Sequence, residues 1–491
     1  MSAAADLAGR TGTTPSELEA VLTAAARAAG PLAALRPRER ARMLTAAADA
    51  LDAAGEELVP LAIEESGLPE QRLRGELRRT TVQLRTFAEV LADGGYLHAV
   101  IDRAEPDTPL GPRPDLRRML IPLGPVLVFA ASNFPFAFSV AGGDTASALA
   151  AGCPVVLKAH PGHPRLSERT GEIVANALRT AGAPDGALGL IFGLDAGTNA
   201  LRDPRMTAAA FTGSAAAGRA LFDIASARPV PIPFYGELGS LNPVFVTAGA
   251  LAARSAEVAG GYVASFTLGT GQFCTKPGLL FLPKGHGLRE VLVQAVRAVP
   301  AARMLYPAVH EGYRGRSLAM SRADGVHALV EGGTAEDLTA APTLLATDVE
   351  TLLRHRDLLL AEAFGPLSVV VSYNGQDELL SAAEAFDGNL TATVHAESGE
   401  AEFVRPLLAR LRERAGRLIY NGWPTGVAVT AAMHHGGPYP SATSALHTSV
   451  GSAAISRFLR PVSYQGMPQE LLPEALRDSN PLGIPQRVNS V

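Results

Sequence analysis

Val126-Leu-Val-Phe-Ala-Ala131 is an apolar run of buried-strand length that ends at Ser132-Asn133. Further runs follow: a strand-like one at 154–157, a helical one at 166–178, and strand-like ones at 187–192 and 207–211. Strands that alternate with helices predict a mostly parallel sheet with helices on both faces. Because such sheets bind ligands where their strands end, we expect the functional residues at the carboxyl edge of the sheet.

The same alternation resumes beyond residue 240. We predict strands at 243–247, 279–282, 367–372, 390–395 and 417–420, and helices at 289–298, 376–386 and 400–414. Residues 14–95 predict helices, 98–118 a proline-rich extended arm, 422–452 a loop, and the tail after Arg457 a strand. The sequence therefore predicts an α/β protein whose two domains share one cleft, with a boundary near residue 240.

Composition narrows the class of protein. Of the 491 residues, 47% are hydrophobic and 19% charged, as in folded globular proteins, and the net charge is −5. This mild acidity gives no reason to expect nucleic acid or an anionic membrane as partner. Two cysteines form no disulfide framework in a chain of this length, so a reducing, cytoplasmic location is expected. Residues 1–6 lack the features of a signal peptide, and the apolar stretch 119–131 is too short to cross a membrane.

Gly271-Gln-Phe-Cys274-Thr-Lys-Pro-Gly278 places a cysteine between two glycines on a predicted turn. Such a thiol can open onto a cleft and act as a nucleophile, whereas a lone cysteine is more often a small buried hydrophobe. A reactive thiol needs positive charge or a helix N-terminus nearby to lower its pKa. Lys276 could supply that charge, or could equally be a solvated surface lysine.

Two further polar residues lie at predicted strand ends. Glu237, in Phe234-Tyr-Gly-Glu237-Leu-Gly239, has apolar and glycine neighbours, and burial there would raise the pKa of its carboxyl into the range of a general base. A surface-loop glutamate is the alternative. Asn133 follows the strand at 126–131 and can donate amide hydrogens to an oxyanion, or can be an ordinary turn asparagine.

Small residues join a strand to a helix at Phe211-Thr-Gly213-Ser214-Ala-Ala-Ala-Gly218-Arg219. Backbone N–H groups at that helix start would suit a pyrophosphate, although a Gly-Ser helix start is common and no G-x-G-x-x-G pattern is present. Lys158 lies just past the strand at 154–157, at the same edge. No cluster with metal-ligand spacing is evident, since His434 and His435 have no Cys or carboxylate partner at a suitable distance. No metal is expected.

Together these segments resemble the aldehyde dehydrogenase superfamily, in the right order from about residue 20 to 465. Gly271-Gln-Phe-Cys274 resembles the nucleophile motif, Glu237-Leu-Gly239 the general-base motif, and Asn133 before Phe-Pro the oxyanion-hole asparagine. The cofactor motifs are matched by Lys158, by the helix start that contains Gly213 and Ser214, and by Glu362-Ala-Phe364-Gly-Pro366.

The resemblance implies two Rossmann-like parallel-sheet domains and a small oligomerisation arm. The implied ranges are 1–97 and 119–240 for the dinucleotide-binding domain, 241–440 for the catalytic domain, and 98–118 and 441–491 for the arm and tail. Because family members exchange an arm strand with a neighbour, a homodimer or homotetramer is expected.

The implied reaction is NAD(P)-dependent oxidation of a small-molecule aldehyde to a carboxylic acid. The Cys274 thiolate attacks the aldehyde, and the Asn133 amide and the Cys274 backbone N–H hold the oxyanion. Hydride then passes to the nicotinamide, whose ribose Glu362 and Phe364 help to bind, and Glu237 activates the water that hydrolyses the thioester.

Finer details resemble one branch, the 2-oxoglutarate semialdehyde (2,5-dioxovalerate) dehydrogenases. The segments 233–243, 265–275 and 471–483 and His435-Gly-Gly-Pro438 carry this likeness. Lys276 and His434 depart from it, because the branch usually has Asn and a Val-like residue there. Candidates on the substrate side are Phe136 and, as cationic partners of a substrate carboxylate, Lys276 and Arg457.

The choice of cofactor is predicted from charge. NAD-preferring members commonly have a glutamate three residues after the strand-end lysine, where this chain has Pro161. Lys158, His160 and Arg219 offer positive or donor groups instead, and arginine suits a 2′-phosphate. We therefore expect that NADP is accepted, and preferred to NAD.

Three alternatives stay open. An NADP-dependent medium- or long-chain fatty aldehyde dehydrogenase is one, because Lys158-Ala-His160 and Arg219 also resemble that group. A reductase of activated acyl groups is another, although it would have no need of Glu237. A non-catalytic protein of the same fold is disfavoured by the presence of Cys274 with Glu237 and Asn133.

Overall fold

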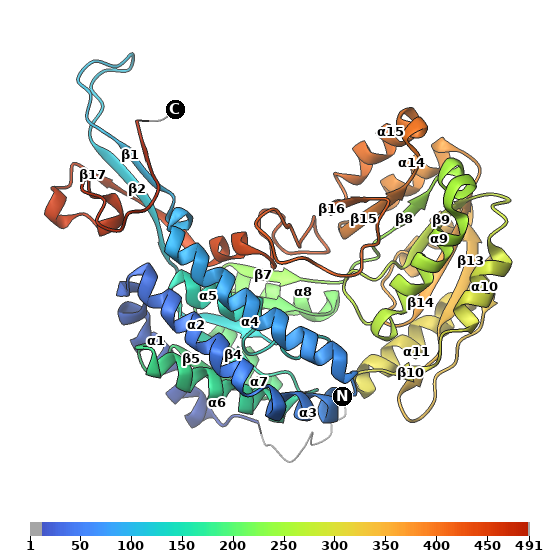
Figure 1. Cartoon of the computed structure of the whole chain (residues 1–491), viewed down its shortest axis with the longest axis horizontal. Coiled ribbons are helices and arrows are strands. Elements are labelled where there is room, and N and C mark those ends of the chain that lie inside the picture. The colour runs from blue at the N-terminus through green and yellow to red at the C-terminus, as the bar shows by residue number, and fades with distance from the viewer. Residues whose placement is uncertain (1–11, 490–491) are drawn as a thin grey trace.

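The computed structural model describes residues 12–489, so the prediction that residues 1–6 form no signal peptide lies outside the described part. A five-stranded parallel sheet is the centre of the first half, with strand order β5-β4-β3-β6-β7 (Figure 1). Its strands are β3 (Val126–Phe129), β4 (Val155–Lys158), β5 (Leu188–Ile191), β6 (Ala208–Thr212) and β7 (Phe234–Glu237). All four residues of β3 are buried, as expected for a central parallel strand. The predicted α/β fold is confirmed here.

Helices cover this sheet. Those between its strands are α5 (Gly143–Ala151), α6 (Pro164–Thr180), α7 (Leu194–Arg202) and α8 (Ala215–Ser226). The helices predicted over 14–95 are α1 (Pro15–Ala34), α2 (Pro37–Ala53), α3 (Gly55–Ser66) and α4 (Glu70–Asp93). α4 packs against α2 and α5, and it ends at Gly94, which has a φ of 75°. One face of α4 is thereby directed into the protein.

A seven-stranded sheet is the centre of the second half, in the order β11-β13-β14-β9-β8-β15-β16. Its strands are β8 (Val244–Val246), β9 (Leu279–Pro283), β11 (His327–Val330), β13 (Thr343–Asp348), β14 (Leu367–Tyr373), β15 (Asn389–His395) and β16 (Ala415–Tyr420). Its helices are α9 (Ala248–Thr267), α10 (Arg289–Arg297), α11 (Pro307–Ser321), α12 (Val349–Arg354), α13 (Arg356–Leu359), α14 (Gln376–Ala385) and α15 (Ala401–Leu411). Only the pairing of β11 with β13 is antiparallel in this sheet. The sequence prediction did not include β11 and β13.

The third sheet forms an arm that projects from the body of the molecule (Figure 1). Its order is β17-β2-β1-β18, with β1 (Ala99–Asp102), β2 (Leu116–Pro122), β17 (Leu459–Gln465) and β18 (Gln486–Val488). A minor pair, β10 (Ala302–Arg303) and β12 (Thr339–Ala340), lies elsewhere. The extended arm expected at 98–118 and the strand expected after Arg457 are both present. Within residues 12–489, no helix has the length and apolar character needed to cross a membrane.

Candidate active site

Cys274 lies in the segment between a short 3-10 helix (Leu268–Gly271) and β9, and its side chain is half-buried. The Asn242 side chain holds this segment, because its Nδ2 donates to the carbonyl oxygens of Cys274 (2.8 Å) and Lys276 (3.0 Å). Gly271 has a φ of 64°, and a Cβ there would collide with the backbone of Gly365 and Pro366. Close backbone packing therefore fixes where the thiol stands.

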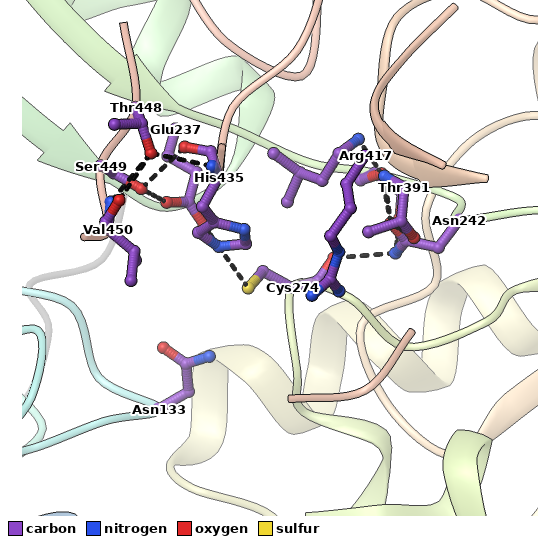
Figure 2. A network of polar contacts seen from close by, with 12 residues as sticks. Asn133, Glu237, Asn242, Cys274, Thr391, Arg417, His435, Thr448, Ser449 and Val450 are labelled. Atoms are coloured by element: carbon purple, nitrogen blue, oxygen red, sulfur yellow. Dashed lines mark hydrogen bonds and ion pairs between the residues drawn. The ribbon is translucent and has the colours of Figure 1, made fainter. Parts of the chain in front are cut away.

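The Cys274 sulfur lies beside two titratable groups (Figure 2). The His435 Nε2 atom is 3.5 Å from the Cys274 Sγ atom and 2.9 Å from the Glu237 Oε1 atom. Ser449 Oγ donates to Glu237 Oε2 at 2.5 Å. Glu237 comes from the end of β7, whereas His435 and Ser449 come from the long loop after β16.

The expectation that His435 has no Cys or carboxylate partner at a suitable distance is therefore wrong. Ligand-type atoms of Glu237, Cys274 and His435 all lie within 4.8 Å of one another. A β-bridge between Glu237 and Ala442 ties the loop to β7 and brings the histidine back over the thiol. The sequence analysis missed this contact, because the residues are far apart in the chain. The sequence signal at this position was the likeness of His435-Gly-Gly-Pro438 to one branch of the family, which did not indicate the contact.

Electrostatics at this site differ from the sequence-based expectation in two ways. Burial pushes the pKa of the Glu237 carboxyl upwards, but His435 and Ser449 outweigh it and leave that pKa below its usual value. Burial and the neighbouring Glu237 carboxylate raise the pKa of the Cys274 thiol well above its usual value. The Glu237 carboxyl is thus ionised and the Cys274 thiol protonated at neutral pH, and a thiol reacts as a nucleophile only after it has lost its proton to a neighbour.

Asn133 follows β3, and its side chain is directed towards the nucleophile segment (Figure 2). Its Nδ2 donates to the Gln272 carbonyl oxygen at 3.1 Å. On the other side, the guanidinium of Arg72 in α4 donates to the Asn133 carbonyl oxygen. The three residues predicted to act together, Cys274, Glu237 and Asn133, are therefore brought to one site.

Lys276 is neither a surface lysine nor a group that faces the thiol. It is 2% exposed, and its Nζ atom donates to the carbonyl oxygens of Ala363 (2.9 Å) and Leu367 (2.7 Å). Burial lowers the pKa of Lys276 to about 8 and raises that of Glu362 to about 7. Its bonds fix the segment that contains Glu362 and Phe364, so its expected roles as thiol activator and substrate partner are corrected.

Two other substrate-side expectations are also corrected. The Phe136 side chain is 2% exposed and belongs to the hydrophobic core around β3. Arg457 is buried, and its Nη1 atom pairs with Asp144 Oδ1 at 2.7 Å, so its charge is already compensated. Neither side chain is free to bind a substrate, because Phe136 is packed in the core and Arg457 is paired with Asp144.

The cofactor candidates lie along the carboxyl edge of the first sheet. Lys158 ends β4, and burial lowers its pKa to about 8. Ser214 caps α8 by accepting a hydrogen bond from the Ala217 N–H, next to Gly213. Arg219, in the first turns of α8, pairs with Asp223 at 2.8 Å between Nε and Oδ1. This set of a helix start and cationic side chains suits the phosphates of a dinucleotide.

His160 differs from its predicted role as a positive group. Burial holds the pKa of its imidazole well below the usual value, so the ring is neutral. Its Nδ1 atom accepts a hydrogen bond from the Gly162 N–H at 3.0 Å, and its ring lies 5.2 Å from that of Tyr306. Of the three predicted positive or donor groups, Lys158 and Arg219 are the cationic ones, and Arg219 is already paired with Asp223.

Comparison with known proteins agrees with this geometry. The aldehyde dehydrogenase family model matches residues 5–462. The chain is 46% identical to alpha-ketoglutaric semialdehyde dehydrogenase 2 of Azospirillum brasilense, over 93% of this chain and 87% of the relative. It is 44% identical to the alpha-ketoglutaric semialdehyde dehydrogenase of Acinetobacter baylyi, over 92% of this chain and 87% of the relative.

Solved structures have the same fold. Aldehyde dehydrogenase 21 from Physcomitrella patens, in complex with the reaction product succinate, superposes with a TM-score of 0.79 at 20% identity, covering 94% of this chain and 92% of that one. An NAD-dependent aldehyde dehydrogenase from Sinorhizobium meliloti gives a TM-score of 0.76 at 25% identity, covering 93% and 88%. The chain therefore belongs to the aldehyde dehydrogenase family and is an oxidoreductase that acts on aldehydes.

Proposed function

We propose that Cys274 is the nucleophile, that Glu237 is the base for hydrolysis, and that Asn133 stabilises the oxyanion. The observation that carries this proposal is the contact of His435 Nε2 with both Cys274 Sγ (3.5 Å) and Glu237 Oε1 (2.9 Å). The proton that leaves the sulfur is taken up by the coupled His435–Glu237 pair, and the N–H at Nε2 then donates to the thiolate. The thiolate forms as this ion pair forms, although burial raises the pKa of the isolated thiol.

The thiolate then attacks the aldehyde carbon, and its oxygen accepts hydrogen bonds from Asn133 Nδ2 and the Cys274 N–H. A nicotinamide dinucleotide, when bound, supplies the acceptor for the hydride. Lys158, Gly213, Ser214 and Arg219 fit its phosphates, and Glu362 and Phe364 lie in the segment proposed to hold its nicotinamide ribose.

Hydrolysis of the thioester completes the reaction. A cavity of about 20 Å³ lies beside Glu237, lined also by His435, Ser449 and Arg457. A space of this size holds about one water molecule. The ionised Glu237 carboxylate removes a proton from a water as it attacks the thioester, which releases the carboxylic acid and returns Cys274 to its starting state.

The test of this proposal is a pair of variants. Cys274→Ala should abolish cofactor reduction, because no thiohemiacetal can form. Glu237→Gln should retain the burst of reduced cofactor but slow later turnovers by about 100-fold or more, because hydrolysis lacks its base. Mass spectrometry of Glu237→Gln should detect the acylated Cys274. Normal turnover by Cys274→Ala would refute the assignment.

We propose 2-oxoglutarate semialdehyde as the substrate and 2-oxoglutarate as the product. Two relatives at 46% and 44% identity that carry the name alpha-ketoglutaric semialdehyde dehydrogenase support this. They do not favour the fatty aldehyde alternative. A chain-length series of aliphatic aldehydes, compared with carboxylated semialdehydes, tests the proposal: the highest kcat/KM should belong to the five-carbon semialdehyde.

We propose NADP as the preferred cofactor. Pro161 stands where a glutamate would repel a 2′-phosphate, and within residues 12–489 no salt bridge neutralises Lys158. Arg219 lies beside the same helix start. The ratio of kcat/KM for NADP to that for NAD should exceed one and should fall in Lys158→Ala; a ratio below one in the wild type would reject the preference.

We further propose a cytoplasmic homodimer or homotetramer that is assembled through the arm. β17 and β18 are the two edge strands of the arm sheet, and edge strands offer unpaired backbone groups to a second copy. Light scattering after size-exclusion chromatography should give a mass of two or four chains. A monomer at micromolar concentration would contradict the assembly.

A further inference from the structure

Three arginine side chains near the nucleophile keep hydrogen-bond donors without partners. Within the described residues, the Nη1 atoms of Arg72 and Arg79 and the Nε atom of Arg417 are buried and make no hydrogen bond. Buried donors are almost always satisfied in native proteins, so each such group needs an explanation. One explanation is that a ligand with acceptor oxygens binds to these donors.

Arg72 and Arg79 lie on one face of α4, together with Glu76, at the spacing i, i+4, i+7. Neither arginine forms a salt bridge within residues 12–489, and Glu76 Oε1 is already bonded to the N–H groups of Phe136 (2.8 Å) and Ala137 (3.0 Å). Burial lowers the pKa of both guanidinium groups, and the nearby Glu76 carboxylate opposes this shift.

The three arginines lie at different positions relative to Cys274, and we therefore expect them to have different roles. Arg79 lies close enough to Glu237, and to Cys274 when the thiol is ionised, for their charges to raise its pKa, and an ionised Cys274 would do the same for Arg417. Arg417 lies on β16, in the other half of the protein, and Figure 2 shows its side chain on the Cys274 side of the network. Arg72 donates to the Asn133 carbonyl oxygen and is therefore a positioning residue for the oxyanion amide.

Aromatic rings lie against two of these guanidinium groups. The Arg72 guanidinium lies 5.0 Å from the Phe134 ring centroid and 4.8 Å from that of Phe273, and that of Arg79 lies 5.4 Å from Phe138. The rings hold the guanidinium planes and reduce the access of water, which strengthens a hydrogen bond to an anion. The two carboxylates nearby, Glu76 and Glu237, leave an excess of positive charge among the three arginines.

We propose that Arg79, together with Arg417, binds the carboxylate at the far end of the substrate and so selects aldehydes that carry an anionic group. This inference rests on the proposed function, because it assigns the recognition of that substrate to residues of this chain. The unpartnered Nη1 of Arg79 and Nε of Arg417 donate to the carboxylate oxygens. The bound carboxylate supplies one negative charge, which matches the excess positive charge among the buried guanidinium groups.

The experiment compares two aldehydes on the full-length enzyme with saturating NADP. One is 2-oxoglutarate semialdehyde, and the other is pentanal, which has the same number of carbon atoms but lacks both the carboxylate and the 2-oxo group. Arg79→Gln should lower kcat/KM for the semialdehyde about 10- to 100-fold, mainly through KM, and change that for pentanal by less than about 3-fold. Arg78→Gln is the matched control, since Arg78 is the exposed neighbour on α4, and it should change neither.

Arg417→Gln provides a second test from the other sheet, with the exposed Arg412→Gln as its control. The same selective loss is expected. Calorimetric titration with 2-oxoglutarate gives a readout that does not depend on turnover: the wild type and Arg78→Gln should bind this product, and Arg79→Gln should bind it about 10-fold or more weakly.

The outcomes separate this inference from the proposed substrate. A wild type that prefers the semialdehyde, combined with Arg79→Gln and Arg417→Gln variants that lose nothing or lose activity equally on both aldehydes, would overturn the role of the arginines. If the wild type instead oxidises pentanal and the semialdehyde with equal kcat/KM and does not bind 2-oxoglutarate, the proposal that 2-oxoglutarate semialdehyde is the substrate is wrong.

Discussion

At the scale of single residues, one imidazole nitrogen connects Cys274, the proposed nucleophile, with Glu237, the proposed base. His435 Nε2 contacts both Cys274 Sγ and Glu237 Oε1, so only one proton can occupy the space between them. The Glu237 pKa below its usual value keeps the carboxylate ionised at neutral pH, and that charge raises the pKa of the thiol. His435 offsets this effect of the Glu237 charge on the thiol, because an imidazolium attracts both the thiolate and the carboxylate.

Removal of His435 should therefore slow formation of the thiolate. In His435→Gln, we expect the alkylation of Cys274 by iodoacetamide at pH 7 to slow about 10-fold or more, and its midpoint to move to higher pH, because no imidazolium stabilises the thiolate. Mass spectrometry of the alkylated peptide measures the rate. His434→Gln, at the neighbouring position outside the contact, should react like the wild type; equal rates in all three proteins would exclude this role of His435.

At the scale of elements, the segment that contains Cys274 is positioned by close backbone packing. The glycine at 271 has a positive φ and lies against the backbone that follows Glu362, so two functional segments fix each other. The loop after β16 is positioned differently, by its bridge to β7 and by the hydrogen bond from Ser449 to Glu237. Small shifts in either segment change the distance between the sulfur and its base.

Gly271→Ala tests this packing. The added Cβ must displace the Gly365 backbone, so we expect a loss of about 2–4 kcal/mol in the free energy of unfolding and a kcat at least about 10-fold lower. Gly285→Ala is the matched control, because Gly285 has a φ of 75° with open space around its Cβ position. It should cost only about 1 kcal/mol and leave kcat unchanged. Equal effects of the two changes on kcat would contradict the packing argument.

At the scale of the whole molecule, folding buries several histidines in neutral form. Burial lowers the pKa of His160, His163 and His395, the last to about 4. The unfolded chain binds these protons near pH 6.5, whereas the folded protein resists them, so lowering the pH favours unfolding. For His395, this loss of stability begins below about pH 6.5 and is complete near pH 4.

The His395 contribution can be isolated. Its ring lies 4.5 Å from the Trp423 ring in the second half of the protein, away from the active site. His395→Gln should reduce by about 3 kcal/mol the loss in unfolding free energy between pH 7 and pH 4, because the difference between pKa 6.5 and about 4 no longer contributes. Urea unfolding at both pH values measures it. An unchanged pH dependence would show that His395 titrates normally in the folded protein.

The sequence by itself determined the α/β alternation, the central strands such as β3, the helices before residue 95, and the segments that contain Cys274, Glu237 and Asn133. These features follow from local periodicity and from motifs within a few residues. Only the tertiary structure determined the partners of the charged and titratable side chains. Lys276 donates to backbone carbonyl oxygens, and Arg457 pairs with Asp144. His435, in a loop distant in sequence, contacts the Cys274 thiol. Contacts between residues far apart in sequence, and the burial that shifts a pKa, depend on the packing of whole elements and cannot be obtained from local pattern.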